Sequence, residues 1–114
     1  MVSVKSWSPD RGDIIWLNPD PQAGPLQTGY KLALVVSPGL YNSKAGLVLL
    51  CLITNDRKDY PFEVSLPGGL TTSGVVLADH VKSCDWLARN AVFVERVPEP
   101  VIREVLAKLA TLVG

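Results

Sequence analysis

The stretch KLALVVSPGLYNSKAGLVLLCLIT, residues 31–54, decides the fold. It begins and ends with apolar runs, KLALVVS and GLVLLCLIT, in which apolar residues barely alternate with polar ones. Such runs are typical of strands that are covered on both faces. The residues between the runs, PGLYNSKAG, are rich in turn formers and predict a turn segment. We therefore expect two fully buried strands joined by a turn.

Weaker strand signals lie on both sides of this stretch. After a polar lead-in of residues 1–12, which we expect to be loosely held, GDIIWLN predicts a strand over about residues 13–17. FEVSL, residues 62–66, alternates as a half-exposed strand does. VVLADHVKSCDWL, residues 75–87, predicts one strand with a kink or two short strands. The turn-rich residues 18–30 form a predicted loop of a length that is usually functional or disordered.

The period of the apolar residues changes at the end of the chain, in EPVIREVLAKLATLVG. One stripe recurs there at helical spacing: Val101, Ile102, Val105, Leu106, Leu109, Leu112 and Val113. Pro98 and Pro100 suit the start of a helix, and Glu99 favours its positive end. A helix this short is marginal alone, so its stripe must pack on the sheet or on another subunit. The predicted fold class is mainly β, a small antiparallel barrel or folded sheet with a C-terminal α-helix.

Composition limits the classes of function. A chain of 114 residues, 47% of them hydrophobic, predicts a single domain over residues 1–114 with a real core. Eleven basic residues balance eleven acidic ones, so contact with a polyanion must come from a few locally placed cations. Cys51 and Cys84 match no metal-binding spacing and are expected to be reduced thiols. Without an apolar stretch long enough for a membrane or an N-terminal signal, we expect a cytoplasmic protein.

Taken one by one, the reactive side chains fit ordinary structural roles. His80 is the single histidine, there is no GxSxG or GxxxxGK[ST] motif, and adjacent Asp79 and His80 would point to opposite faces of a strand. Lys31, at the start of a buried strand, usually keeps its ammonium in water. Thr54 fits simple β-propensity, and Arg57 and Lys58 lie in a mixed-charge loop.

Four blocks in order change this interpretation: PDRGDIIWLNPDPQAG, LVVSPGLYNSKAG, YPFEV and GVVLADHVKSCDWLAR. With them, nearly the whole chain resembles the MazF (PemK, ChpB-related) family of toxin endoribonucleases from bacterial toxin–antitoxin modules. The resemblance implies an SH3-like β-barrel with a C-terminal helix, a symmetric homodimer, and cleavage of single-stranded RNA without a metal or other cofactor. It also implies a MazE-like antitoxin that blocks the RNA groove, and binding of operator DNA only through the toxin–antitoxin complex.

In this family the ribose 2′-OH attacks the adjacent phosphorus, giving a 2′,3′-cyclic phosphate and a 5′-OH end. The resemblance implies that an arginine and a threonine serve the phosphate, and the threonine corresponds to Thr54. The family motif glutamate-glutamine-x-glycine-x-arginine-proline corresponds to Leu26-Gln27-Thr28-Gly29-Tyr30-Lys31-Leu32. Gln27 and Gly29 are kept and become candidate RNA-binding residues. Lys31 replaces the arginine, and a point charge cannot grip two phosphate oxygens as a guanidinium does, so an attenuated nuclease is one interpretation.

His80 stands where the family more often has glutamine, in a strand bordering the RNA groove. It is therefore a candidate RNA contact and a candidate compensating proton-transfer group, since an ordinary histidine titrates near pH ~6.5. Arg57 and Lys58 complete the candidate RNA-binding residues.

Two other functions stay open. A gyrase poison of the CcdB type shares the fold but has an aromatic residue near its terminus, whereas this chain ends in TLVG. A degenerate family member would keep dimerisation and antitoxin binding without catalysis. The helix stripe and the run of residues 75–77 fit either a dimer interface or the core of one chain.

Overall fold

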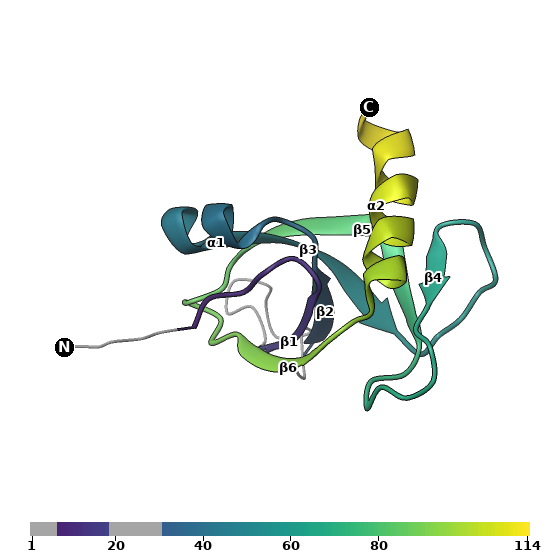
Figure 1. Ribbon diagram of the computed structural model, residues 1–114, viewed down its shortest axis with the longest axis horizontal. Helices are drawn as coiled ribbons and strands as arrows, with labels where there is room; N and C mark the ends of the chain where they lie inside the picture. Colours follow the sequence, from purple (N-terminus) through teal and green to yellow (C-terminus); the bar gives the residue numbers. More distant parts are fainter. Residues whose placement is uncertain (1–6, 19–30) are drawn as a thin grey trace, which may run out of the picture.

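The computed structural model describes residues 7–18 and 31–114, and within them six strands form a single sheet (Figure 1). The elements are β1 (Asp13–Leu17), β2 (Lys31–Val35), α1 (Gly39–Ala45), β3 (Leu47–Thr54), β4 (Glu63–Ser65), β5 (Val75–Asp85), β6 (Val92–Arg96) and α2 (Glu99–Val113). The strand order is β4-β5-β3-β2-β1-β6, and neighbouring strands are antiparallel. The predicted mainly β class with a C-terminal helix is confirmed.

The two apolar runs form neighbouring strands at the centre of this sheet. Ala33 pairs with Leu52 and Val35 with Leu50, and β2 is covered on both faces as predicted. The prediction that β3 is fully buried is wrong for its first half. Leu49 is 38% exposed there, although its neighbours Val48 and Leu50 are buried, because apolar side chains cover β3 on one face only at this end.

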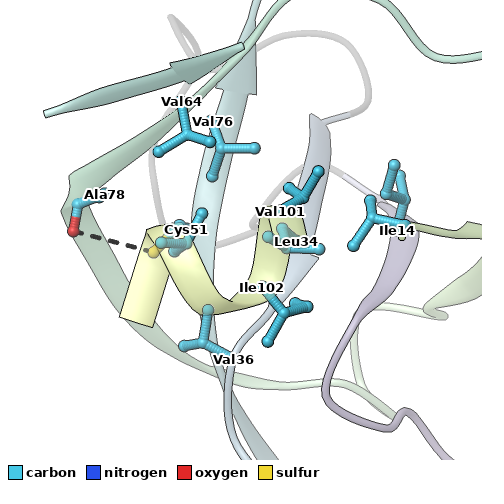
Figure 2. Packing of buried hydrophobic residues seen from close by; sticks show 11 residues of the cluster. Ile14, Leu34, Val36, Cys51, Val64, Val76, Ala78, Val101 and Ile102 are labelled. Atoms are coloured by element: carbon cyan, nitrogen blue, oxygen red, sulfur yellow. Dashed lines mark hydrogen bonds between the residues drawn. The ribbon is translucent and has the colours of Figure 1, made fainter. Parts of the chain in front are cut away.

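One core cluster lies between the sheet and α2 (Figure 2). Val101, Ile102 and Val105 of the helix stripe are buried against strand residues such as Leu34 and Val76. Burying each of these aliphatic side chains contributes about 1.5–3 kcal/mol, which holds a helix that would be marginal alone. A second cluster packs on the opposite face of the sheet. Its buried members are Ile15, Leu17, Ala33, Val35, Val48, Leu50, Cys84 and Trp86.

This packing bears on whether the helix stripe and residues 75–77 form a dimer interface or the core of one chain. Val75 and Val76 have no exposed surface and belong to the core of the chain, whereas Leu77 is only partly buried. The helix stripe divides: its first half is buried, and Leu112 and Val113 at its end are 51% and 77% exposed. Both cysteines are free thiols, as predicted. Burial raises the pKa of the Cys51 thiol to about 11.

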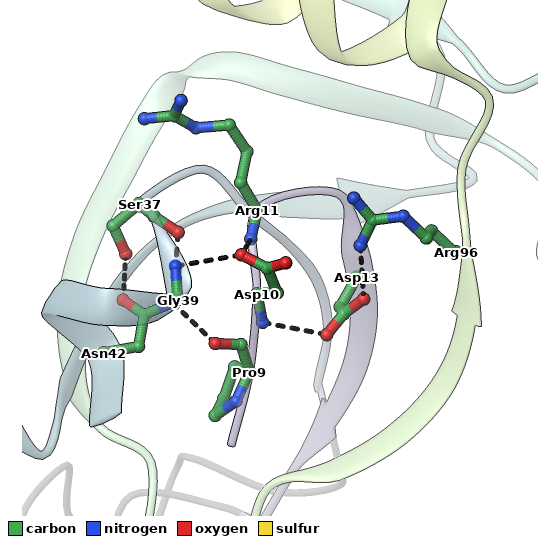
Figure 3. Close-up of polar contacts among 8 residues, drawn as sticks. All are labelled: Pro9, Asp10, Arg11, Asp13, Ser37, Gly39, Asn42 and Arg96. Atoms are coloured by element: carbon green, nitrogen blue, oxygen red, sulfur yellow. Dashed lines mark hydrogen bonds and ion pairs between the residues drawn. The ribbon is translucent and has the colours of Figure 1, made fainter. Parts of the chain in front are cut away.

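The segment between β2 and β3 is the helix α1, where a turn was predicted. Asn42 in this helix is completely buried, and its side-chain amide donates to the carbonyls of Pro9 at 2.8 Å and Ser37 at 3.0 Å (Figure 3). Gly46 ends the helix with a φ of +71° and donates its N–H to the Asn42 carbonyl. Seven residues are too few to show a helical period, and contacts distant in sequence stabilise the helix.

The end of the lead-in is also held more firmly than predicted. The Asp10 carboxylate accepts the backbone N–H of Gly39 at 2.9 Å, at the start of α1 (Figure 3). Arg11 donates from its guanidinium to the Val36 carbonyl at 2.7 Å, and Asp13 pairs with Arg96 at 3.0 Å. The described part of the lead-in is therefore tied to α1 and to the residue that follows β2, and Asp13, the first residue of β1, is tied to β6. Within the described residues, no helix is long and apolar enough to cross a membrane.

Candidate functional site

A cavity of about 450 Å³ opens where β2, β3 and β5 meet the connection that leads into β4. This volume is in the usual range for a ligand site. The cavity is lined by Lys31, Leu52, Ile53, Thr54, Asp56, Lys58, Tyr60, Glu63, Leu77 and His80. Four predicted site residues thus come together from separate elements: Lys31, Thr54, Lys58 and His80.

Lys31 and Thr54 stand at the two ends of the stretch that decides the fold, and strand pairing brings them to one edge. β2 and β3 are antiparallel, with Ala33 opposite Leu52. Continuing this register by two residues sets Lys31 level with Thr54, and both side chains line the cavity. Because two residues is one full period of a strand, both stay on the same face as the pair Ala33 and Leu52.

The hydroxyl of Thr54 takes part in a tight turn directly after β3. Its Oγ1 accepts the backbone N–H of Asp56 at 3.0 Å. A hydroxyl that accepts one hydrogen bond can still donate its own proton. Thr54 can therefore offer a hydrogen bond to an oxygen atom of a bound group.

His80 reaches the cavity because β5 is kinked, which was one of the two forms predicted for this segment. Cys51 pairs with Val81 and Ile53 with Val76, so residues 77–80 of β5 lie opposite Leu52 alone. Such an irregularity re-aims side chains and is frequent beside active sites. Both Asp79 and His80 are exposed here, and simple alternation does not describe their positions.

The two carboxylates that line the site, Asp56 and Glu63, already have partners within the protein. The Glu63 carboxylate accepts the backbone N–H groups of Lys58 at 2.7 Å and Asp59 at 3.0 Å. Asp56 forms an ion pair of 2.9 Å with the Lys58 ammonium, which raises the pKa of Lys58 through a hydrogen bond between two well-exposed side chains. Lys31 takes part in none of the ion pairs among the described residues.

The lining of the cavity also contains an aromatic residue. Tyr60 lines the cavity and donates its hydroxyl to the Asp79 carboxylate. This hydrogen bond raises the pKa of Tyr60 to about 12, from an ordinary value of 10. Nearby Phe62 lies with its ring centroid 6.5 Å from that of Tyr60. Together with Leu52, Ile53 and Leu77, Tyr60 gives the cavity an apolar floor beside its cations.

Of the predicted RNA-binding residues that the structure describes, only Arg57 is not part of this lining. Arg57 is exposed and donates from Nη1 to the Ser65 hydroxyl at 2.9 Å, so its guanidinium is directed along β4. Gln27 and Gly29 lie outside the described residues, as does the predicted loop of residues 18–30 apart from Asn18. No group of three or more His, Cys, Asp or Glu side chains in the described ranges is placed to hold a metal ion.

Sequence reasoning had missed Tyr60, Asp56 and Glu63 as lining residues. Tyr60 could have been found from its place two positions after a lysine, in a connection between strands. Aromatic residues interleaved with cations are typical of sites that bind single-stranded nucleic acid. No sequence pattern indicates Asp56 and Glu63, since both make local contacts that shape the turn around Lys58.

Comparison with known proteins gives one consistent result. The sequence profile of the PemK-like, MazF-like toxins of type II toxin–antitoxin systems matches residues 10–113. The endoribonuclease toxin MazF of Escherichia coli strain K12 is 42% identical over 111 residues, which cover 97% of this chain and 99% of that protein. The endoribonuclease PemK of Escherichia coli is 37% identical, over 90% of this chain and 80% of that protein.

Solved structures agree with the sequence comparison. MazF from Deinococcus radiodurans (Form-I) superposes with a TM-score of 0.85 at 49% identity, covering 96% of this chain and 99% of that one. A MazE–MazF structure from the same organism (Form-II) gives a TM-score of 0.84 at 45% identity, covering 96% and 98%.

Proposed function

Because the chain belongs to the family of PemK-like, MazF-like toxins of type II toxin–antitoxin systems, we propose that it is an endoribonuclease whose RNA substrate binds in the cavity described above. The observation that carries the assignment of the site is the pairing of β2 with β3. This register, continued by two residues, brings Lys31 and Thr54 to the same end of the two strands, and both side chains line one cavity. A cation beside a hydroxyl donor suits a phosphate group in which negative charge develops.

The proposed reaction needs no group beyond the RNA itself as nucleophile. The ribose 2′-OH attacks the adjacent phosphorus, the bond from phosphorus to the 5′ oxygen breaks, and the products are a 2′,3′-cyclic phosphate and a 5′-OH end. The 2′-OH gives up a proton and the leaving oxygen gains one. In this scheme Lys31 stabilises charge on the phosphorane oxygens, and Thr54 donates a hydrogen bond to one of them.

The apolar residues of the cavity favour single-stranded RNA over a duplex as the substrate. A base that is splayed out of a strand can stack on Tyr60 and pack against Leu52 and Leu77, whereas a base in a duplex remains stacked on its neighbours. His80 lies on the same wall, and we assign it to an RNA contact at the rim. Lys58 supplies a second cation for the backbone of the strand.

Partners follow from the same proposal. The MazE–MazF structures from Deinococcus radiodurans contain a relative of this chain with MazE. We extend this to a MazE-like antitoxin that covers the RNA-binding cavity of a homodimer of this chain. Since eleven basic residues are balanced by eleven acidic ones, operator DNA is assigned to the toxin–antitoxin complex and not to this chain alone. Cellular RNA as substrate places the proposed activity in the cytoplasm.

One observation favours a second candidate, a family member with weakened catalysis that acts mainly by binding its antitoxin. Lys31 supplies a point charge where a guanidinium would make two parallel hydrogen bonds to a phosphate. Such a protein would still fold, dimerise and bind the antitoxin. A gyrase poison has no comparable support, because the described cavity places its cations around the end of β3 and the relatives are endoribonucleases.

The test is to incubate the purified protein with a single-stranded RNA rich in uracil and adenine, in EDTA, and to map the new ends. Cleavage that leaves 5′-OH ends and survives EDTA is the expected result. The matched control is Thr54→Ala, which keeps the strand but removes the hydroxyl. Intact RNA together with tight antitoxin binding would point to the weakened family member, and gyrase-dependent DNA breaks would point to the gyrase poison.

A further inference from the structure

Thr54 is positioned in the cavity by more than its own strand, since another segment lies close to its carbonyl group. This segment is the connection of residues 66–74, which runs from β4 to β5. Its last residue, Gly74, lies against the backbone of Thr54. We propose that Gly74 is a positioning residue that sets the place of Thr54 in the cavity. The inference rests on the role given to Thr54 in the proposed function.

The contact is too close for any other residue. A Cβ atom at Gly74 would lie 2.4 Å from the carbonyl oxygen of Thr54 and 3.0 Å from its carbonyl carbon. Ordinary van der Waals contact begins about 1 Å farther out than the shorter distance. The Asn55 side-chain oxygen would also lie 3.0 Å away. Any side chain at this position therefore forces the end of β3 and the beginning of β5 apart.

Gly74 itself has little room to retreat. Its carbonyl accepts the N–H of Leu66 at 3.0 Å, and the next residue, Val75, is completely buried and pairs with Thr54. Its φ of +114° is a conformation that residues with a side chain rarely adopt. The backbone that carries Gly74 is thus fixed on both sides.

The same connection is anchored at its middle. The Glu95 carboxylate, on β6, accepts the N–H and the hydroxyl of Thr71 at 3.1 and 2.8 Å and the N–H of Thr72 at 2.7 Å. Close to the contact, the Ser73 hydroxyl donates to the Asn55 side chain at 3.2 Å. With the connection held in this way, a side chain at Gly74 displaces Thr54 more readily than it displaces the connection.

The expected consequence is a loss of catalysis without loss of RNA binding. A misplacement of about 1 Å in a catalytic group costs on the order of 10²-fold in rate. We therefore expect Gly74→Ala to lower kcat by roughly 10- to 100-fold. KM should change little, since Lys58, Tyr60 and His80 line other parts of the cavity.

The chain offers a matched control in the same connection. Gly69 also has a positive φ, +98°, but a Cβ atom there would meet nothing within 4 Å. Gly69→Ala introduces a similar backbone strain without a contact to Thr54. We expect it to lower thermal stability in the same direction as Gly74→Ala while leaving kcat close to that of the parent protein.

A double-mutant cycle separates positioning from general damage. Gly74→Ala is combined with Thr54→Ala, and both are measured in single turnover with excess protein at a temperature where all variants are folded. If Gly74 acts through the Thr54 hydroxyl, its substitution costs little further rate once that hydroxyl is gone. An equal fall in both backgrounds, or an equal fall with Gly69→Ala, overturns the proposal.

A second readout does not depend on RNA cleavage. The NMR signals of the Thr54 amide and methyl groups should shift in Gly74→Ala and stay in place in Gly69→Ala, and unchanged Thr54 signals would refute the positioning role. If the parent protein proves inactive, the proposed function fails, yet this comparison still tests the contact.

If Gly74→Ala does not fold, Ser73→Ala is the milder substitute, since it removes the bond to Asn55 without strain. It should lower kcat in the parent background and not in the Thr54→Ala background, and the absence of this difference would count against the proposal.

Discussion

The hydroxyl of Tyr60 donates a hydrogen bond shared between the two carboxylate oxygens of Asp79, at 2.7 and 2.8 Å. Tyr60 belongs to the connection before β4, and Asp79 to the kinked part of β5. The bond therefore ties one wall of the cavity to the strand that carries His80. In the proposed function, this bond orients the tyrosine ring as a stacking surface for an RNA base before the RNA binds.

This bond predicts an alkaline titration. The pKa of Tyr60 is raised to about 12, first by the hydrogen bond to Asp79. Because the folded-state value lies above the ordinary value of about 10, the stability from this bond is complete below pH ~10 and is lost as the pH rises toward 12. Asp79→Asn should return the midpoint toward the ordinary value. NMR of ¹³C-labelled tyrosine measures it, with Tyr60→Phe assigning the signal, and an unchanged midpoint in Asp79→Asn would contradict the prediction.

Lys31 should control the chemical step. Lys31→Ala removes the cation beside Thr54, and we expect kcat/KM to fall by roughly 10²- to 10³-fold, as for the loss of one group that stabilises developing charge. Lys31→Arg should raise kcat above that of the parent protein, because a guanidinium binds two phosphate oxygens at once. Lys44→Ala, on the helix α1 and outside the cavity, is the matched control. A Lys31→Ala variant with parental activity would remove Lys31 from the mechanism.

Lys58 should contribute to binding through simple electrostatics. Its ion pair with Asp56 is exposed, with 66% of the lysine side chain accessible, and such pairs are weak enough for a phosphate to compete. For Lys58→Gln we expect weaker RNA binding and a slope of log K against log salt that is smaller by about 0.7. Titration of labelled RNA at several salt concentrations measures the slope, again with Lys44→Gln as control. An unaltered slope would show that Lys58 meets no phosphate.

His80 should act in binding. We expect His80→Gln to keep a hydrogen-bonding side chain at the rim and to leave kcat near the parental value, and His80→Ala to raise KM about fivefold, the worth of one hydrogen bond. Initial rates over a range of RNA concentrations separate the two constants. If His80→Gln instead lowers kcat strongly and removes its dependence on pH, then His80 transfers a proton and the assignment to binding is wrong.

Glu95 should make the protein sensitive to acid. Hydrogen bonds from Thr72 and then Thr71 lower the pKa of this carboxyl to about 2. Because the folded-state value lies below the ordinary one, the stability that these bonds provide is present above pH ~4.5 and is lost as the pH falls toward 2. Glu95→Gln should lower the melting temperature at neutral pH and flatten its fall in acid. Glu104→Gln, on the exposed face of α2, should follow the parental curve; identical curves for all three proteins would contradict the role of Glu95.

Local sequence patterns predicted those elements that have a distinctive composition or a regular apolar period. The run GDIIWLN indicated a strand at residues 13–17, and β1 spans Asp13–Leu17. The apolar stripe after Pro98 indicated the terminal helix, because a period of 3.6 residues sustained along the whole segment is typical of an amphipathic helix and not of a strand. Residues Lys31, Thr54, Lys58 and His80 were singled out by resemblance to a toxin family, and the structure places all four around one cavity.

The tertiary structure decided what depends on contacts between distant segments. α1 was not predicted, since seven residues show no period and the buried amide of Asn42 holds them to Pro9. β6 was not predicted either, and it is defined by its pairing with β1. The shared cavity of Lys31 and Thr54 comes from the pairing of β2 with β3, and the exposure of Asp79 and His80 from an irregularity in β5. The sequence by itself determined which side chains are apolar and with what period, because burial acts residue by residue. Register, kinks and the close approach of Gly74 to Thr54 arise when separate segments share one hydrogen-bonded sheet, and no local pattern contains that information.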